Sequence, residues 1–174
     1  GISAQWFKPC LMELGGKNAA VVTASADLDA AAEGVMRSAF SLQNQKCSAT
    51  SRVYVDRKVA APFVERLVEK TRAIRMGDPT ERDVFFGPVI NGRAVERFDR
   101  AVAQARAEGR VVLGGERLRG SVFDKGHFVA PTIASLPLTS SLFREELFVP
   151  FLAVGEVDGL GQAIAESNGA EYGL

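Results

Sequence analysis

The strongest constraint on the fold is an alternation of short apolar runs with longer amphipathic segments. Residues 18–23 form an apolar run between Gly15-Gly16 and a polar cluster, which predicts a buried strand. Residues 28–42 carry apolar side chains at helical spacing, and Asp27 or Ser25 is placed to cap that helix. Strands that alternate with helices in this way form right-handed βαβ units. We therefore predict an α/β fold of three layers (αβα), with a mostly parallel sheet covered on both faces.

The rest of the chain continues this alternation. Strands are expected at residues 52–55, 111–113, 128–133 and 151–157, and helices at residues 59–75, 91–109 and 160–166. Pro131 indicates that the strand at residues 128–133 is an edge or irregular strand, because proline cannot donate to a sheet ladder. Residues 43–48 break the helical pattern and are expected to form a loop. All 174 residues are predicted to form a single domain.

Charge and composition exclude several classes of protein. The 21 basic and 21 acidic side chains cancel, so neither nucleic acid nor an anionic membrane surface is an expected partner. The longest apolar stretch, residues 148–154, is interrupted by Pro150 and is too short to span a bilayer. The two cysteines make no disulfide framework, which favours a reducing, cytoplasmic location. No cluster has metal-ligand spacing, so no metal site is predicted.

Cys47 is the first candidate for chemistry. It lies in a polar loop beside Lys46, where a thiol can be accessible and close to a cation that favours the thiolate. The alternative is a small buried hydrophobic side chain, the commoner role of a single cysteine. Cys10 has apolar neighbours and is expected to pack. Because His127 is the one histidine, a Cys-dependent hydrolase stays open as an alternative.

Two acidic positions are further candidates. Glu13 lies on an apolar segment just before Gly15-Gly16, where a carboxylate can act on water as a general base. The two glycines would let the backbone approach a ligand closely. The alternative is a Glu13 that pairs with Lys17, with the glycines forming a turn. Glu145-Glu146 is interpreted either as an acceptor for sugar hydroxyls or as a solvated surface patch.

Three short motifs occur in a fixed order along the chain: Met12-Glu13-Leu14-Gly15-Gly16-Lys17-Asn18, then Gln45-Lys46-Cys47, then Glu145-Glu146-Leu147-Phe148-x-Pro150. In their order and spacing the chain resembles the aldehyde dehydrogenase superfamily, and the resemblance covers essentially the whole chain. The run from Gln45 to Ala49, followed by Ser51-Arg52, is most similar to the 1-pyrroline-5-carboxylate dehydrogenase branch.

The resemblance implies the thiol-bearing catalytic domain of an NAD(P)-dependent enzyme that oxidises an aldehyde to a carboxylic acid. Cys47 would be the nucleophile and would pass through a thiohemiacetal and a thioester. Glu13 would activate the water that hydrolyses the thioester, and Ser48 would line the aldehyde pocket. The branch resemblance narrows the substrate to glutamate semialdehyde/1-pyrroline-5-carboxylate, oxidised to glutamate in proline catabolism.

The same resemblance implies a cofactor site. Glu146 would bind the hydroxyls of the nicotinamide ribose, and Phe148, Leu14 and Gly15 would lie beside the nicotinamide. NAD is the expected cofactor, with NADP as an alternative. The family's dinucleotide-binding domain has no counterpart here, so residues 1–16 are interpreted as the junction with it. The domain alone is expected to be inactive, and the full-length protein to form a homo-oligomer.

Two departures from the family pattern leave another class of function open. Asn44 stands where the family usually has glycine, next to the nucleophile loop. Val149 replaces the glycine expected between Phe148 and Pro150. If these side chains distort their loops, the chain would be a folded but catalytically inactive structural or oligomerising fragment.

Overall fold

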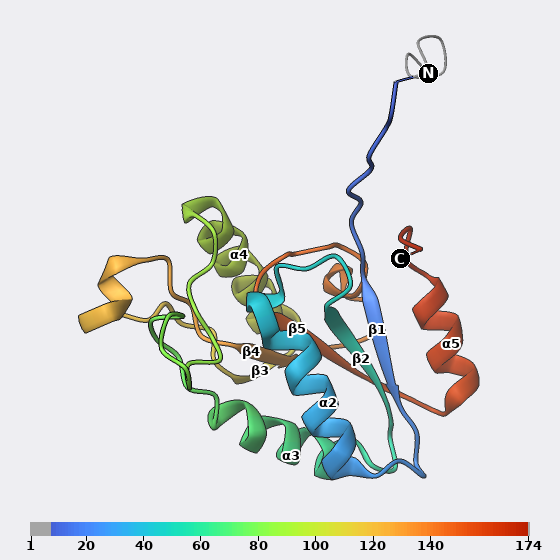
Figure 1. Cartoon of the computed structure of the whole chain (residues 1–174). Coiled ribbons are helices and arrows are strands. Elements are labelled where there is room, and N and C mark those ends of the chain that lie inside the picture. Colours follow the sequence, from blue (N-terminus) through green and yellow to red (C-terminus); the bar gives the residue numbers. More distant parts are fainter. Residues whose placement is uncertain (1–7, 174) are drawn as a thin grey trace.

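A five-stranded sheet forms the centre of the computed structural model, which describes residues 8–173 (Figure 1). The strand order is β1-β2-β5-β4-β3, and each neighbouring pair is parallel except β3 with β4. The strands are β1 (Asn18–Val22), β2 (Thr50–Asp56), β3 (Arg110–Leu113), β4 (Thr132–Ser135) and β5 (Phe151–Val157). The predicted mostly parallel sheet is therefore confirmed.

Helices cover both faces of this sheet (Figure 1). The helices are α2 (Leu28–Phe40), α3 (Ala60–Arg72), α4 (Gly92–Glu108) and α5 (Leu160–Asn168). Val53 and Val55 of β2 pack in one core with α2 and α3, whereas Tyr54 between them packs in the other core with α4 and Ala163 of α5. This division follows from the alternation of side chains along a strand. The predicted three-layer α/β fold is confirmed.

Local sequence fixes where two of the helices begin. The Asp27 carboxylate accepts hydrogen bonds from the backbone N–H groups of Asp29 and Ala30 at the start of α2. The Asn91 side chain accepts from the Ala94 N–H at the start of α4. Each cap satisfies backbone donors that have no partner within the helix. The cap predicted at Asp27 is thus present, and Asn91 caps α4 in a similar way.

One predicted strand is displaced. β4 begins at Thr132, directly after Pro131, and it lies inside the sheet between β3 and β5. The edge alternative predicted for residues 128–133 is therefore wrong, whereas the irregular alternative describes the pairing before Pro131. Before Pro131 the chain makes only isolated bridges, such as the one between Arg117 and Val129, and the regular ladder starts where each residue again has an N–H to donate.

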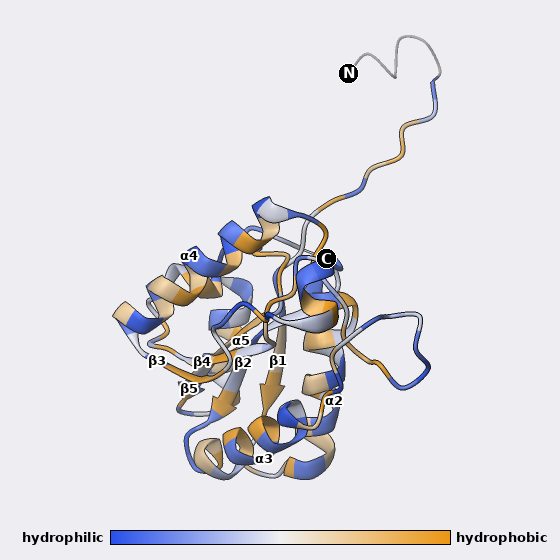
Figure 2. Ribbon diagram, turned by 90° about the vertical axis from the view of Figure 1, so that its left-hand side faces the viewer, coloured by the Kyte–Doolittle hydropathy of each residue, from blue (hydrophilic) through white to orange (hydrophobic). Residues whose placement is uncertain are grey.

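Apolar residues concentrate along the strands, and the helices carry both apolar and polar residues (Figure 2). On α5 the apolar side chains of Leu160 and Ile164 are exposed. Within residues 8–173, no helix has the length and apolar character needed to cross a membrane. Residues 8–14 extend away from the sheet, and every one of them is exposed (Figure 1). Cys10 lies on this segment, so the prediction that Cys10 packs is wrong.

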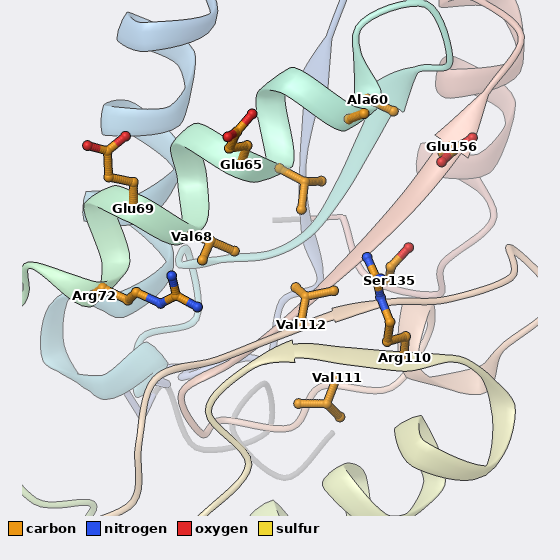
Figure 3. A pocket seen from close by; sticks show the side chains of 12 residues that line it. Ala60, Glu65, Val68, Glu69, Arg72, Arg110, Val111, Val112, Ser135 and Glu156 are labelled. Atoms are coloured by element: carbon orange, nitrogen blue, oxygen red, sulfur yellow. The ribbon is translucent and has the colours of Figure 1, made fainter.

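A cavity of about 830 Å³ lies between α3 and β3 (Figure 3). Its walls combine valines with charged side chains: Val64, Val68, Glu65, Glu69 and Arg72 from α3, and Arg110, Val111 and Val112 from β3. None of the predicted site residues lines it. This cavity is therefore not the site that the sequence motifs predict.

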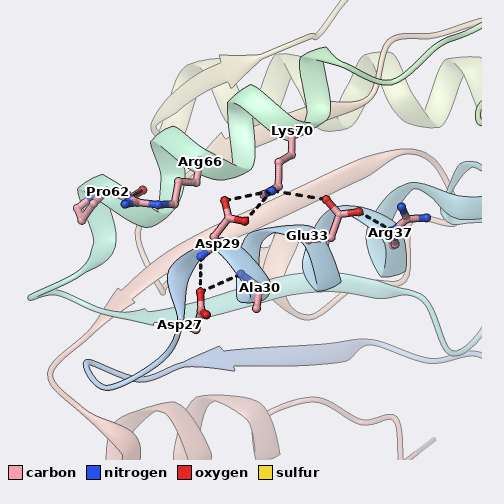
Figure 4. Close-up of polar contacts among 8 residues, drawn as sticks. All are labelled: Asp27, Asp29, Ala30, Glu33, Arg37, Pro62, Arg66 and Lys70. Carbon is pink, nitrogen blue, oxygen red and sulfur yellow. Dashed lines mark hydrogen bonds and ion pairs between the residues drawn. The ribbon is translucent and has the colours of Figure 1, made fainter.

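Ion pairs connect the outer surfaces of α2 and α3 (Figure 4). The Lys70 ammonium of α3 lies 3.1 Å from an Asp29 carboxylate oxygen and 3.6 Å from a Glu33 oxygen, both on α2. Glu33 also pairs with Arg37 one turn further along α2, at 2.6 Å. Such surface pairs contribute roughly 0–1 kcal/mol each, so burial in the core is the main reason that the two helices stay together.

Candidate active site

The sheet topology brings the three motifs together. Residues 15–17 immediately precede β1, Cys47 precedes β2, and residues 145–150 precede β5. Because β1, β2 and β5 are parallel neighbours, the segments that precede them meet at the same edge of the sheet. In many open α/β sheets ligands bind beyond the opposite, carboxyl edge. The candidate site is therefore defined by its residues and not by a general rule of the fold class.

A cavity of about 630 Å³ lies at this edge. It is lined by Glu13, Leu14, Gly15, Gln45, Lys46, Cys47, Arg97, Glu146, Leu147 and Phe148. Six of the predicted site residues therefore line a single cavity, although they come from all three motifs. Ser48 is exposed and is not among the lining residues, so its contact with an aldehyde stays a prediction.

Gly15 and Gly16 lie in close contact with both of the other motifs. The Gly16 N–H donates to a Glu146 carboxylate oxygen at 2.9 Å. A Cβ atom at Gly16 would lie 2.0 Å from the Cys47 carbonyl oxygen, and one at Gly15 would lie 2.7 Å from Glu146 Oε2. Glycine is thus required here because the backbone runs against its neighbours without space for a side chain.

Substitution of Gly16 by alanine is expected to displace the Cys47 loop. Its methyl group would meet a backbone oxygen, which cannot rotate away, so we expect a loss of about 1–3 kcal/mol of folding free energy. Urea unfolding measures this loss. Gly34→Ala is the control, because it adds a methyl group to α2 with nothing within 4 Å and should stabilise by roughly 0.5–1 kcal/mol. Equal stability of the two variants would contradict the close approach.

The loop before Cys47 contains three consecutive left-handed residues, Leu42, Gln43 and Asn44, with φ of 51°, 56° and 58°. Asparagine tolerates this conformation better than most residues that carry a side chain. The buried Asn44 amide donates to the Ala39 carbonyl at 2.7 Å and to the Thr50 carbonyl at 2.8 Å. Asn44 is therefore accommodated in the left-handed conformation, and its side chain holds the two ends of the loop together.

The Glu146 loop is held from two sides. Gly16 binds the Glu146 carboxylate, and the Arg97 guanidinium of α4 donates to the Leu147 carbonyl at 2.9 Å. The left-handed residue here is Phe148, with φ of 55°, while Val149 is fully buried in the core. Sequence reasoning missed Arg97, because the periodicity of α4 places it beside the apolar face and gives no sign of what it contacts.

Two buried cations lie behind these loops. The Arg52 guanidinium donates to the Lys17 carbonyl at 2.8 Å and to the Ser167 carbonyl at 2.8 Å. The Lys17 side chain is 2% exposed. Burial and the neighbouring Arg52 guanidinium lower the pKa of Lys17 to about 7, although Glu145 and Glu146 act in the opposite direction. Within residues 8–173 there is no ion pair between Lys17 and Glu13, because Glu13 lies on the exposed segment.

Residues 2–174 match the aldehyde dehydrogenase family. The chain belongs to this family. It is 36% identical over 170 residues to the 1-pyrroline-5-carboxylate dehydrogenase of Geobacillus kaustophilus, a match that covers 97% of this chain and 32% of that protein. It is 38% identical over 173 residues to the chloroplastic betaine aldehyde dehydrogenase of Beta vulgaris, covering 99% and 34%.

A solved member of the aldehyde dehydrogenase family has the same fold. The structure of 1-pyrroline-5-carboxylate dehydrogenase from Thermus with bound NAD matches with a TM-score of 0.84 and 36% sequence identity, over 92% of this chain and 30% of that chain. The chain thus spans about a third of the length of the relatives that it matches. The α/β fold and the family that the motifs indicate are both confirmed.

Other chemistry has less support in this aldehyde dehydrogenase domain. His127 is exposed and lines a separate cavity of about 160 Å³, whereas the residues that line the Cys47 cavity include no histidine. A hydrolase that needs a Cys–His pair is therefore disfavoured. Among residues 8–173, no group of three or more His, Cys, Asp and Glu side chains is arranged to hold a metal ion.

Proposed function

We propose that this chain is the thiol-bearing catalytic domain of an NAD-dependent aldehyde dehydrogenase, with Cys47 as nucleophile and Glu13 as general base. The observation that carries the proposal is the convergence of Cys47, Glu13 and Glu146 on one cavity from three separate motifs. The left-handed loop that Asn44 ties together supports an intact nucleophile site, rather than a decayed structural fragment.

In the proposed first step, the Cys47 thiolate attacks the aldehyde carbon, and a C–S bond forms as the carbonyl becomes an oxyanion. The Cys47 backbone N–H has no acceptor within residues 8–173, so it is available to stabilise that oxyanion. The cavity residues Leu14, Glu146 and Phe148 would hold a nicotinamide cofactor, which would supply the acceptor for the hydride of the thiohemiacetal carbon, so that this carbon is left as the Cys47 thioester. The Asn18 amide donates to the Cys47 carbonyl at 2.8 Å and keeps the loop in place during these steps.

In the second step, Glu13 takes a proton from water and the resulting hydroxide attacks the thioester carbon. The C–S bond breaks, the carboxylic acid leaves and the Cys47 thiolate is restored. Glu13 is exposed and lines the cavity, a position that supports a role in activating water.

The lining residues fit a nicotinamide cofactor. The Gly16 N–H donates to Oε1 of Glu146, so Oε2 can accept hydrogen bonds from ribose hydroxyls. Gly15 lines the same cavity, and Leu14 and Phe148 supply apolar contacts for a flat ring. NAD is the proposed cofactor, and NADP is the comparison in a binding assay. The Thermus relative with bound NAD supports this choice.

For the substrate we propose glutamate semialdehyde, as in the 1-pyrroline-5-carboxylate dehydrogenase relatives. The run from Gln45 to Ala49 supports this substrate. Overall sequence identity does not distinguish it, because the identity to a betaine aldehyde dehydrogenase is as high as the identity to a 1-pyrroline-5-carboxylate dehydrogenase. A ratio of kcat/KM values for the two aldehydes decides between them. The full-length protein is proposed to be a cytoplasmic homo-oligomer, which size-exclusion chromatography and cell fractionation test.

The covalent mechanism is tested by trapping the acyl enzyme in the full-length protein. With aldehyde and NAD, Glu13→Gln is expected to accumulate a Cys47 thioester, because the thiol step proceeds while hydrolysis of the thioester slows by about 10²–10⁴-fold. Mass spectrometry of the Cys47 peptide measures the adduct. Glu81→Gln, a carboxylate on a distant surface loop, is the matched control and should hydrolyse its adduct normally. An adduct on Cys10, or none on Cys47, would contradict the mechanism.

A further inference from the structure

Lys17 has a buried amine beside the candidate site. Its side chain is 2% exposed, and its Nζ atom has no hydrogen-bond partner within residues 8–173. Lysine is almost never fully buried without a partner, because an ammonium loses its hydration there. A long apolar side chain would fill the same space at lower cost, so the amine requires an explanation.

The charges that face this amine come from two elements. Arg52 on β2 repels it, and Arg52 is already engaged by backbone carbonyls, including that of Lys17 itself. Glu145 and Glu146, in the loop before β5, attract it. The balance lowers the pKa of Lys17 to about 7. The amine is therefore an ammonium in weakly acidic solution and becomes neutral in weakly basic solution.

Lys17 lies between the two residues that hold the site together. Gly16 donates its N–H to the Glu146 carboxylate at 2.9 Å, and the Asn18 amide donates to the Cys47 carbonyl at 2.8 Å. The backbone of Lys17 is itself fixed by Arg52 at 2.8 Å. The side chain of Lys17 is buried, and its charge acts on the carboxylates of the neighbouring loop through space, without a direct hydrogen bond.

We propose that Lys17 is a positioning residue whose buried ammonium supplies the counter-charge for Glu145 and Glu146, and so holds Glu146 in place for the cofactor. Lys17 does not line the cavity, so it acts through Glu146 and does not touch the ligand. This inference rests on the proposed role of Glu146 in cofactor binding. It goes further in stating that affinity for NAD depends on the charge of one amine behind the site.

Binding of NAD to the full-length protein tests the proposal. At about pH 6 we expect Lys17→Met to weaken NAD binding by about tenfold, measured by titration calorimetry, because the counter-charge is lost. At about pH 8.5 wild type and variant should bind almost equally, since Lys17 is then neutral. Lys17→Arg keeps its charge throughout and should retain tight binding at the higher pH. Lys58→Met removes an exposed lysine and should bind like wild type.

A second measurement does not require a folded variant at position 17. The ¹³Cε resonance of Lys17, followed by NMR, is expected to titrate close to neutral pH in this chain. Glu145→Gln and Glu146→Gln should each lower the pKa of Lys17 further, because each removes an attracting carboxylate. By reciprocity, bound NAD should raise the pKa of Lys17 in the full-length protein.

The outcomes separate this inference from the proposed function. A Lys17 resonance that titrates like an exposed lysine would overturn the inference, and so would equal NAD affinity of wild type and a folded Lys17→Met at about pH 6. Neither result affects the role of Cys47. A wild-type protein that binds no NAD at any pH would instead contradict the proposed function itself.

Discussion

Substitution of Cys47 by alanine in the full-length protein is expected to lower kcat/KM for aldehyde oxidation by at least about 10⁴-fold. The reason is that the thiol provides the covalent bond through which both steps run, and the residues that line the cavity include no second thiol and no hydroxyl. Initial rates of NADH formation measure the loss. Binding of NAD should change much less, because Glu146, Phe148 and Gly15 supply the proposed cofactor contacts.

Cys10→Ala is the matched control for this experiment. Cys10 lies on the exposed segment, outside the cavity, so its removal should leave kcat/KM within about twofold of wild type. An active Cys47→Ala variant would refute the thiol mechanism. A variant that is inactive because it has unfolded is recognised by its circular dichroism spectrum and its Tm.

Lys17→Met is expected to stabilise the folded chain at about pH 6, by up to about 5 kcal/mol. The pKa of Lys17 falls from 10.5, the value for an unperturbed lysine, to about 7 on folding. Between these two values the unfolded state binds more protons than the folded state, so the contribution of Lys17 to stability rises with pH. Below about pH 7 the cost of burying the ammonium is complete, and above about pH 10.5 it disappears.

Urea unfolding of wild type and variant across this pH range measures the difference in unfolding free energy. The advantage of Lys17→Met should be largest at about pH 6 and shrink steadily toward pH 10. Lys58→Met should show no such trend, because Lys58 is exposed. A Lys17→Met chain that is less stable than wild type at pH 6 would mean that the ammonium stabilises the fold. A gain in stability together with weaker NAD binding is the signature of a residue kept for function.

The fold was largely predictable because hydrophobic periodicity reports burial directly. Residues 18–23 and 151–157 are apolar over the length of a strand, and both form strands in the structure. The strand expected at residues 128–133 was misplaced because of Pro131. Proline cannot donate a hydrogen bond to a neighbouring strand at its own position, but a central strand can begin at the next residue, as β4 does at Thr132.

The candidate site was predictable only in part. The sequence motifs identify Cys47, Glu13 and Glu146 as candidates, and the order of the strands places these residues at one cavity. The structural roles of Arg52 and Arg97 were not visible, because their partners are backbone carbonyls distant in sequence. The burial of the Lys17 amine, which has no hydrogen-bond partner within residues 8–173, was not visible either. Periodicity describes one element at a time and contains no information about such contacts.

The segment from Gly16 to Asn18 acts as a fixed spacer between the nucleophile loop and the carboxylate loop. Gly16, its first residue, binds Glu146, and Asn18, its last residue, binds the Cys47 carbonyl. Both loops are therefore positioned by the same short stretch of backbone. Lys46 and Ser48 flank Cys47 with exposed side chains and lie outside those two hydrogen bonds. Substitutions of the Lys46 and Ser48 side chains are therefore expected to leave the spacing between the two loops intact.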